Sequence, residues 1–93
     1  MNPQYLQNND DLYRYLLWLS DELKQKGMFE VSREVEWASK FANGSPSEFL
    51  HEAVTALTSA HAKCSDILTE AQLTEVASVI GQIHAAFQRV GGG

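Results

Sequence analysis

Cysteine, proline and long apolar runs are nearly absent from this chain. Its 93 residues include one cysteine, Cys64, and two prolines. A lone cysteine excludes an internal disulfide and is typical of a protein from a reducing compartment. No apolar run approaches the ~20 residues that cross a bilayer, and the N-terminus lacks the charged and apolar regions of a signal peptide, so we expect a cytoplasmic protein.

Basic residues are also few. Seven Lys and Arg stand against twelve Asp and Glu, which gives a formal net charge of -5. The bases are dispersed and form no stripe on any predicted helix: Arg14, Lys24, Lys26, Arg33, Lys40, Lys63 and Arg89. Because phosphate groups repel an acidic protein, we expect neither nucleic acid nor a membrane surface as a partner.

Glycine is scarce inside the chain, and its positions divide the sequence into long segments. Three of the six glycines form the C-terminal end, which leaves Gly27, Gly44 and Gly81. Strand-like alternation of apolar and polar residues does not occur. With so few chain-breaking residues, the folded part must consist of a few long segments.

Apolar residues recur at helical spacing in four of these segments. We predict an all-α fold, a four-helix up-down-up-down bundle, because connections of about two to five residues place successive helices side by side and antiparallel. The predicted helices cover about 9–26, 29–42, 46–63 and 70–89. We expect a flexible arm over 1–8, one domain over 9–90 and a flexible glycine tail over 91–93.

Each predicted helix carries one apolar stripe that should face a common core. In chain order the stripes are Leu12, Leu16, Leu19 and Leu23; Val31, Val35, Ala38 and Ala42; Phe49, Ala53, Leu57, Ala60 and Cys64; and Leu73, Val76, Ile80, Ile83, Phe87 and Val90.

Local signals mark the ends of the helices. Gly27 follows the first helix and supplies its C-terminal stop. Ser45 and Glu48 have the spacing of a capping box before the third helix. Thr69 and Gln72 repeat this pattern before the fourth helix.

Aromatic residues are concentrated in the first half, since only Phe87 of the nine lies after residue 50. On a helical wheel, Leu17 and Trp18 lie away from the stripe of the first helix. Trp37 and Phe41, four residues apart, form a second ridge on the second helix. The first two helices are therefore apolar on more than one side.

Two interpretations of these residues stay open. In the first, they pack inside the bundle, and the N-terminal arm with Tyr5 and Leu6 covers Trp18. In the second, they form a partner or dimer surface, since exposed Trp, Tyr and Phe are typical anchors of protein interfaces. The candidate interaction surface consists of Tyr13, Leu17, Trp18, Trp37 and Phe41.

The sequence therefore favours a protein-interaction or regulatory module whose partner is a second copy of the chain or another protein. An acidic inhibitor that blocks a basic target is an alternative, which the net charge permits. A binder of small apolar ligands is a further alternative.

No residue pattern indicates an enzyme, a metal site or a cofactor. His51, His61 and His84 are at least ten residues apart, whereas two zinc ligands on one helix need a spacing of about three or four. We expect His84 to be half-buried and satisfied by a carboxylate or water, and His51 to face solvent.

Cys64 and Glu34 are the remaining candidates for chemistry. Cys64 lies on a core stripe near the end of a helix, where the helix dipole disfavours a thiolate, so we interpret it as a small core residue. Glu34 falls within an apolar arc, and we expect it to reach the rim and pair with Lys or Arg.

The fourth helix carries a ridge of small residues, Ala77, Gly81 and Ala85, at four-residue spacing. Such a ridge allows a second helix to approach closely. The alternative is a face exposed to solvent, where Gly81 costs about 1 kcal/mol of helix stability.

Overall fold

A computed structural model describes residues 9–90 of the chain. The described residues form four α-helices and no strand, so the predicted all-α four-helix fold is confirmed. The elements are α1 (Asn9–Gln25), α2 (Phe29–Ser39), a short 3-10 helix η1 (Lys40–Asn43), α3 (Pro46–Lys63) and α4 (Glu70–Val90). The predicted arm at 1–8, which includes Tyr5 and Leu6, and the predicted glycine tail at 91–93 lie outside the described residues.

The second helix differs from the prediction in its last turn. Its α-helical part ends at Ser39, and the next four residues continue as the tighter η1. Phe41 and Ala42 still pack against the core from this turn. A tighter final turn is a common way for a helix to satisfy its last carbonyl groups.

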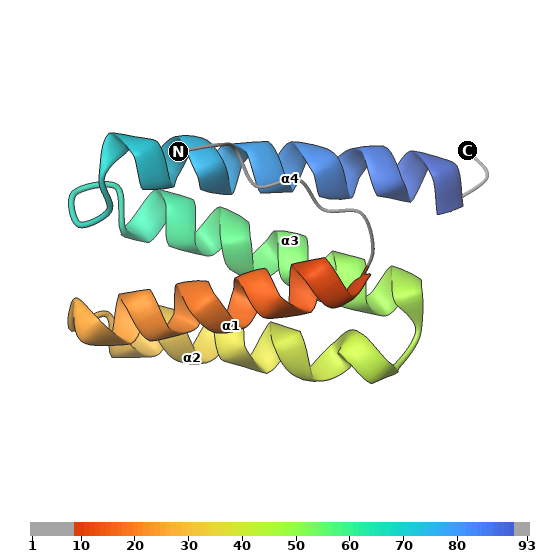
Figure 1. Ribbon diagram of the computed structural model, residues 1–93, viewed down its shortest axis with the longest axis horizontal. Coiled ribbons are helices and arrows are strands. Elements are labelled where there is room, and N and C mark those ends of the chain that lie inside the picture. Colours follow the sequence, from red (N-terminus) through yellow and green to blue (C-terminus); the bar gives the residue numbers. More distant parts are fainter. Residues whose placement is uncertain (1–8, 91–93) are drawn as a thin grey trace.

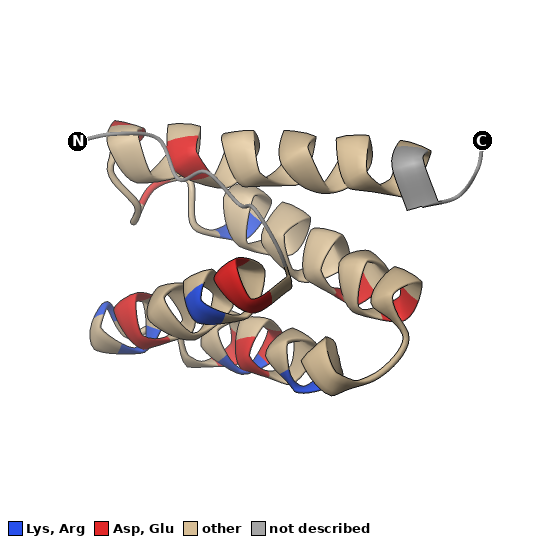
Figure 2. Ribbon diagram, turned by 45° about the vertical axis from the view of Figure 1, so that its right-hand side comes forward, with Lys and Arg blue, Asp and Glu red and all other residues tan. Residues whose placement is uncertain are grey.

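Successive helices pack against one another along the chain, and the contact between α1 and α2 is the most extensive. Figure 1 shows the chain turning back at each connection, so that the axes of the helices are roughly aligned. Figure 2 shows α1 and α2 beneath α3, and α4 above α3. A closed up-down-up-down bundle further requires α4 to lie as close to α1 as it does to α3, and this finer topology stays a prediction.

The core lies where the predicted stripes meet. The buried stripe residues are Leu12, Leu16, Leu19, Leu23, Val31, Val35, Ala38, Phe49, Ala53, Leu57, Ala60, Cys64, Val76 and Ile83. In α4, Leu73, Ile80 and Phe87 are only partly buried, whereas Val79, which the predicted stripe omits, is fully buried. The buried face of α4 therefore runs through Val79 and is rotated slightly from its predicted position.

Gly27 ends α1, as predicted. Its φ of 84° lies in the left-handed region, which a residue without a Cβ adopts at little cost. The N–H of Gly27 donates to the carbonyl of Lys24 at 3.1 Å, and the N–H of Met28 donates to the carbonyl of Leu23 at 2.9 Å. This pair of bonds is a Schellman motif, and it satisfies two of the last carbonyl groups of α1.

The two predicted capping boxes have different outcomes. At the start of α4, the N–H of Gln72 donates to Thr69 Oγ1 at 3.1 Å, and the N–H of Thr69 donates to Gln72 Oε1 at 3.0 Å, so this box is confirmed. At α3, Ser45 occupies the N-cap position but makes no capping hydrogen bond. Its Oγ lies 3.1 Å from Ser47 Oγ instead. The predicted hydrogen bonding of the first box is therefore wrong, because a neighbouring hydroxyl competes for the serine.

Candidate functional site

Large apolar side chains are exposed on the outside of α1 and α2. The exposed fractions are 36% for Tyr13, 38% for Leu17, 45% for Trp18 and 57% for Trp37, and Phe41 is partly buried. A small monomeric domain rarely leaves several such side chains next to one another in water. Tyr13, Leu17, Trp18 and Trp37 therefore do not pack wholly inside the bundle. The N-terminal arm that the first interpretation places over Trp18 lies outside the described residues.

Tyr13 and Leu17 form the first apolar group. They lie one helical turn apart on α1 and line an open hollow of about 340 Å³. Glu36 from α2 and Lys40 from η1 line the same hollow. This group therefore lies along the seam between α1 and α2.

Trp37 and Phe41 form the second apolar group. Their rings meet edge to face, with centroids 5.6 Å apart and an interplanar angle of 80°. Trp37 also lines a hollow of about 410 Å³ between α2 and α3, together with Arg33 from α2 and Glu52 from α3. This second group therefore lies on the side of α2 that borders α3.

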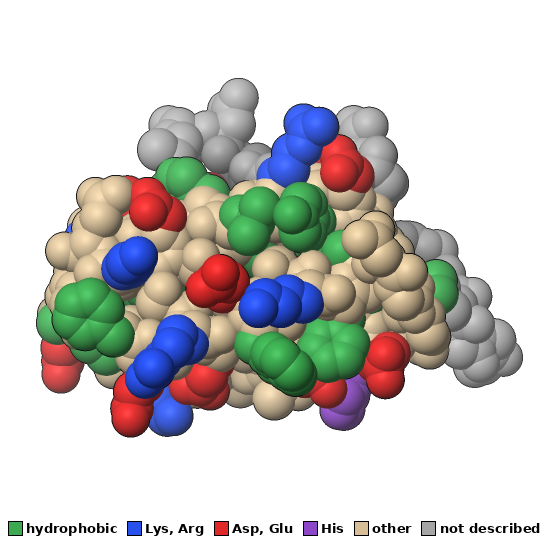
Figure 3. Space-filling model, turned by 90° about the horizontal axis from the view of Figure 1, so that it is seen from below, with side chains coloured by type: hydrophobic (Ala, Val, Ile, Leu, Met, Phe, Trp, Pro, Cys, Tyr) green, Lys and Arg blue, Asp and Glu red, His purple; other side chains and the backbone are tan. Residues whose placement is uncertain are grey.

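The two groups flank α2 on either side. We call the surface that carries them the α1–α2 face and define it by Tyr13, Leu17, Trp37 and Phe41. Figure 3 shows hydrophobic side chains gathered in separate groups on the surface, with acidic and basic side chains between them. Glu36 and Lys40 are exposed side chains of α2 and η1 on this face. The face is thus a mixture of apolar groups and charges of both signs.

Trp18 lies apart from the α1–α2 face. Successive residues of an α-helix point about 100° apart, so the orientation of Leu17 toward α2 turns Trp18 to another flank of α1. There its ring contacts that of Tyr15, with centroids 6.0 Å apart. The structure therefore places four of the five candidate residues in two groups flanking α2, Tyr13 with Leu17 and Trp37 with Phe41, and leaves Trp18 outside both.

Sequence reasoning missed Tyr15, which is only 4% exposed. Its phenol oxygen is buried and has no hydrogen-bond partner among the described residues. Burial raises the pKa of this phenol, and the nearby Glu75 of α4 raises it further. A signal was present, since Tyr15 follows Leu12 by three residues and precedes Leu19 by four, on the same helical face.

Cys64 is a core residue, as predicted. Its thiol is buried and forms no disulfide. Burial raises the pKa of the thiol, the charge of Glu34 raises it further, and Lys63 acts in the opposite direction. Because only the thiolate is a strong nucleophile, the raised pKa makes the Cys64 thiol less reactive.

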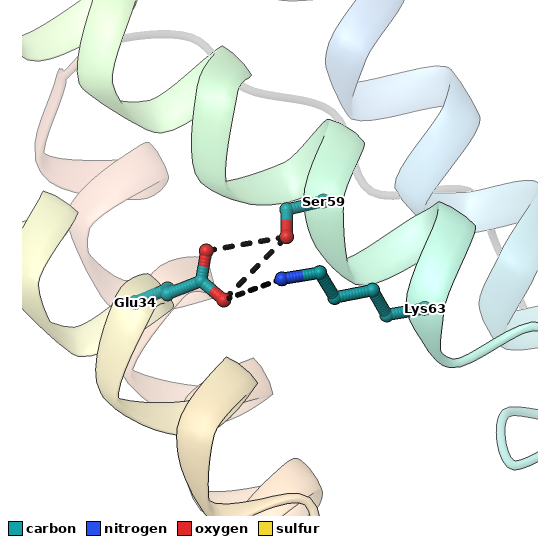
Figure 4. Close-up of polar contacts among 3 residues, drawn as sticks. All are labelled: Glu34, Ser59 and Lys63. Atoms are coloured by element: carbon teal, nitrogen blue, oxygen red, sulfur yellow. Dashed lines mark hydrogen bonds and ion pairs between the residues drawn. The ribbon is translucent and has the colours of Figure 1, made fainter.

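Glu34 reaches the rim between α2 and α3, as predicted, and Figure 4 shows its polar contacts. Its Oε1 lies 3.5 Å from Lys63 Nζ, and Ser59 Oγ donates to its Oε2 at 3.2 Å. Both charged side chains are well exposed, so the ion pair contributes little to stability. The cluster joins two helices, and Glu30 of α2 and Glu52 of α3 line the same hollow as Glu34.

The histidines do not gather into a site. His51 is exposed, as expected, but His84 is exposed as well, so its predicted half-burial is wrong. Because the buried face of α4 runs through Val79 and Ile83, His84 points beyond its edge. His61 is partly buried beside a hollow that faces α4. Within residues 9–90, no group of three or more His, Cys, Asp and Glu could hold a metal ion.

The small-residue ridge of α4 faces outward. Ala77, Gly81 and Ala85 are all exposed. A Cβ added at Gly81 would meet no atom within 4 Å. Of the two alternatives for this ridge, the solvent-exposed face is therefore the one found within this chain.

Among the described helices, none combines the length and apolar character that a membrane crossing needs. Comparisons of the chain with protein-family models, with curated proteins and with solved structures found no match. Its function is therefore inferred from its own side chains.

Proposed function

We propose that the chain is a non-enzymatic protein-interaction module that forms a homodimer through the α1–α2 face. Trp37 carries this proposal, because it is 57% exposed and tryptophan is among the residues that most often anchor interfaces. The edge-to-face contact with Phe41 holds the Trp37 ring in place. A ring that is already held loses little conformational freedom when a partner covers it.

The apolar content of the face suits a small dimer. A specific interface buries about 800 Å² on each partner, with an apolar centre and a polar rim. Large aromatic side chains bury about 150–250 Å² each when they are fully covered, and Tyr13 and Trp37 still expose 36% and 57% of their surface to a partner. Tyr13, Leu17, Trp37 and Phe41 can therefore supply the centre, and the charged residues around them can supply the rim.

The charges of the face favour a second copy of the chain as the partner. Glu36 and Lys40 lie beside Leu17. The hollow beside Trp37 is lined by Arg33 and by three acids, Glu30, Glu34 and Glu52. A dimer interface with twofold symmetry needs a surface that is complementary to itself. Acids and bases interspersed among apolar groups meet this requirement.

A cytoplasmic location belongs to the same proposal. It is supported by Cys64, which is buried and forms no disulfide. Proteins of reducing compartments keep such thiols in the reduced form.

Sedimentation velocity tests the proposed dimer. Over about 1–100 µM, we expect the sedimentation coefficient to rise with concentration toward that of a dimer. Trp37→Ala should weaken the association by about tenfold or more, because an aromatic anchor of an interface contributes about 2 kcal/mol.

Trp18→Ala is the matched control, because it removes the other exposed tryptophan, which lies off the face. Its dimer affinity should stay within about twofold of the wild-type value. A wild-type chain that remains monomeric up to about 100 µM contradicts the proposal. So does a Trp18→Ala variant that loses as much affinity as Trp37→Ala.

A further inference from the structure

Glu36 and Lys40 lie beside the apolar groups of the α1–α2 face. Both side chains are exposed, and both line the hollow beside α1. They are four residues apart, a spacing at which an acid and a base on a helix often pair. Within the described part of the chain, however, neither side chain takes part in an ion pair. An unpaired acid and an unpaired base thus stand next to exposed apolar side chains.

A symmetric dimer repeats each contact, because residue i of one copy meets residue j of the other and residue j meets residue i. When two copies of one helix pair antiparallel about a twofold axis, residues equally far before and after the axis lie opposite one another. An axis level with Ala38 therefore places Glu36 opposite the partner's Lys40, and Lys40 opposite the partner's Glu36. Opposite charges meet at both places.

The two flanks of α2 fit the same axis. The twofold rotation places the flank of α2 beside α1 next to the same flank of the partner's α2. It also places the flank beside α3 next to the partner's flank beside α3. Glu36 and Lys40 share the flank beside α1, where both line one hollow with α1 side chains. Trp37 lies on the flank beside α3, in ring contact with Phe41. At this register, Trp37 lies midway along the helix axis between the partner's Trp37 and the partner's Phe41. Aromatic side chains of one copy therefore meet aromatic side chains of the other.

From these relationships we infer that two copies pair α2 against α2, antiparallel about a twofold axis near Ala38, with reciprocal Glu36–Lys40 ion pairs beside the packed aromatic rings. The inference rests on the proposed homodimer and adds the register of its interface. Each copy carries a net charge of -5, so two copies repel one another at long range. Reciprocal ion pairs within the contact offset this repulsion and select one register among those that the apolar groups allow.

Charge reversal tests this register by sedimentation equilibrium. Glu36→Lys alone places a lysine opposite a lysine at both ends of the contact, and Lys40→Glu alone places a glutamate opposite a glutamate. Each single variant should weaken dimerisation by about tenfold or more, because two ion pairs become two contacts between like charges.

Mixing the two single variants separates contacts between copies from contacts within one helix. In their heterodimer a lysine faces a glutamate at both places, so an equimolar mixture should recover the wild-type affinity within about threefold. Pairing within one helix cannot explain this recovery, because neither variant chain carries both charges. The double variant Glu36→Lys, Lys40→Glu should recover the affinity as well.

Asp66→Lys is the control, since it makes the same charge change in the connection between α3 and α4. Its affinity should stay within about twofold of the wild-type value, and circular dichroism verifies that every variant keeps its helices. A monomeric wild-type chain overturns both the homodimer and this register. A wild-type dimer that is insensitive to the single reversals, or a mixture that associates no more tightly than its components, overturns the register alone.

Discussion

Ser32 on α2 donates a hydrogen bond to the backbone carbonyl of Ser20 on α1, with an Oγ to O distance of 2.7 Å. Both serines are buried, with exposed fractions of 6% and 8%. A polar contact inside an apolar seam allows fewer alternative alignments than apolar packing does, since a shift leaves its donor unpaired. This bond therefore helps to set how α1 and α2 align, and with it the relative positions of Leu17 and Trp37.

Ser32→Ala should lower the free energy of unfolding by about 1 kcal/mol, because it removes the buried bond to Ser20. Urea denaturation followed by circular dichroism measures the change. Ser39→Ala is the matched control, since Ser39 is also buried but bonds to Glu36 of its own helix. An equal loss in both variants indicates that the bond between α1 and α2 contributes nothing specific.

Tyr15→Phe should raise the free energy of unfolding by about 1 kcal/mol, because the buried phenol oxygen gains no hydrogen bond in exchange for lost hydration. The oxygen has no partner among the described residues. The same denaturation measurement applies at pH 7. A loss of stability instead indicates that Tyr15 Oη has a partner in solution, such as a bound water.

The pH dependence of stability tests whether the Tyr15 phenol stays protonated in the folded chain. Burial raises the pKa of Tyr15 in the folded chain, whereas the unfolded chain keeps the ordinary tyrosine pKa of about 10. The contribution of the protonated phenol to folding stability is therefore complete below about pH 10. It declines at higher pH, because the unfolded chain then loses this proton first. The wild-type chain should therefore lose up to about 1.4 kcal/mol per pH unit more than Tyr15→Phe above pH 10. Parallel stability curves for the two proteins contradict this assignment.

The fold could be predicted from the sequence where its signals are local. Gly27 and the pair Thr69 and Gln72 act through backbone groups a few residues away, so their roles follow from spacing alone. Ser45 shows the limit of this reasoning. Its hydroxyl has two partners within reach, and the one that it contacts, Ser47 Oγ, depends on side-chain geometry that spacing does not determine.

The candidate surface could be predicted only in part. The helical wheel shows that Leu17 and Trp18 lie off the apolar stripe, but it does not show which flank of α1 borders α2. That depends on how the helices pack, and packing separates Trp18 from the face around Trp37. Tyr15 shows the opposite limit, since its spacing predicts burial while its hydroxyl is typical of exposed sites.

Alanine substitution of the two N-cap residues, Thr69 and Ser45, should change the free energy of unfolding by different amounts. Thr69→Ala should lower the free energy of unfolding by about 1 kcal/mol, because it removes the hydrogen bond from the Gln72 N–H. Ser45→Ala should change it by less than about 0.5 kcal/mol, since Ser45 makes no capping bond. Thermal denaturation of both variants measures the difference in their stability. Equal losses indicate that Ser45 caps α3 in solution.

Gly27 and Gly81 predict opposite effects of substitution by alanine. Gly81→Ala should raise the free energy of unfolding by about 0.5–1 kcal/mol, because the position is helical and open. Gly27→Ala should lower it by about 1 kcal/mol, because a Cβ disfavours its φ of 84°. Sedimentation of Gly81→Ala should match that of the wild-type chain. If this variant loses self-association instead, the ridge of α4 is the contact surface and the α1–α2 face is not.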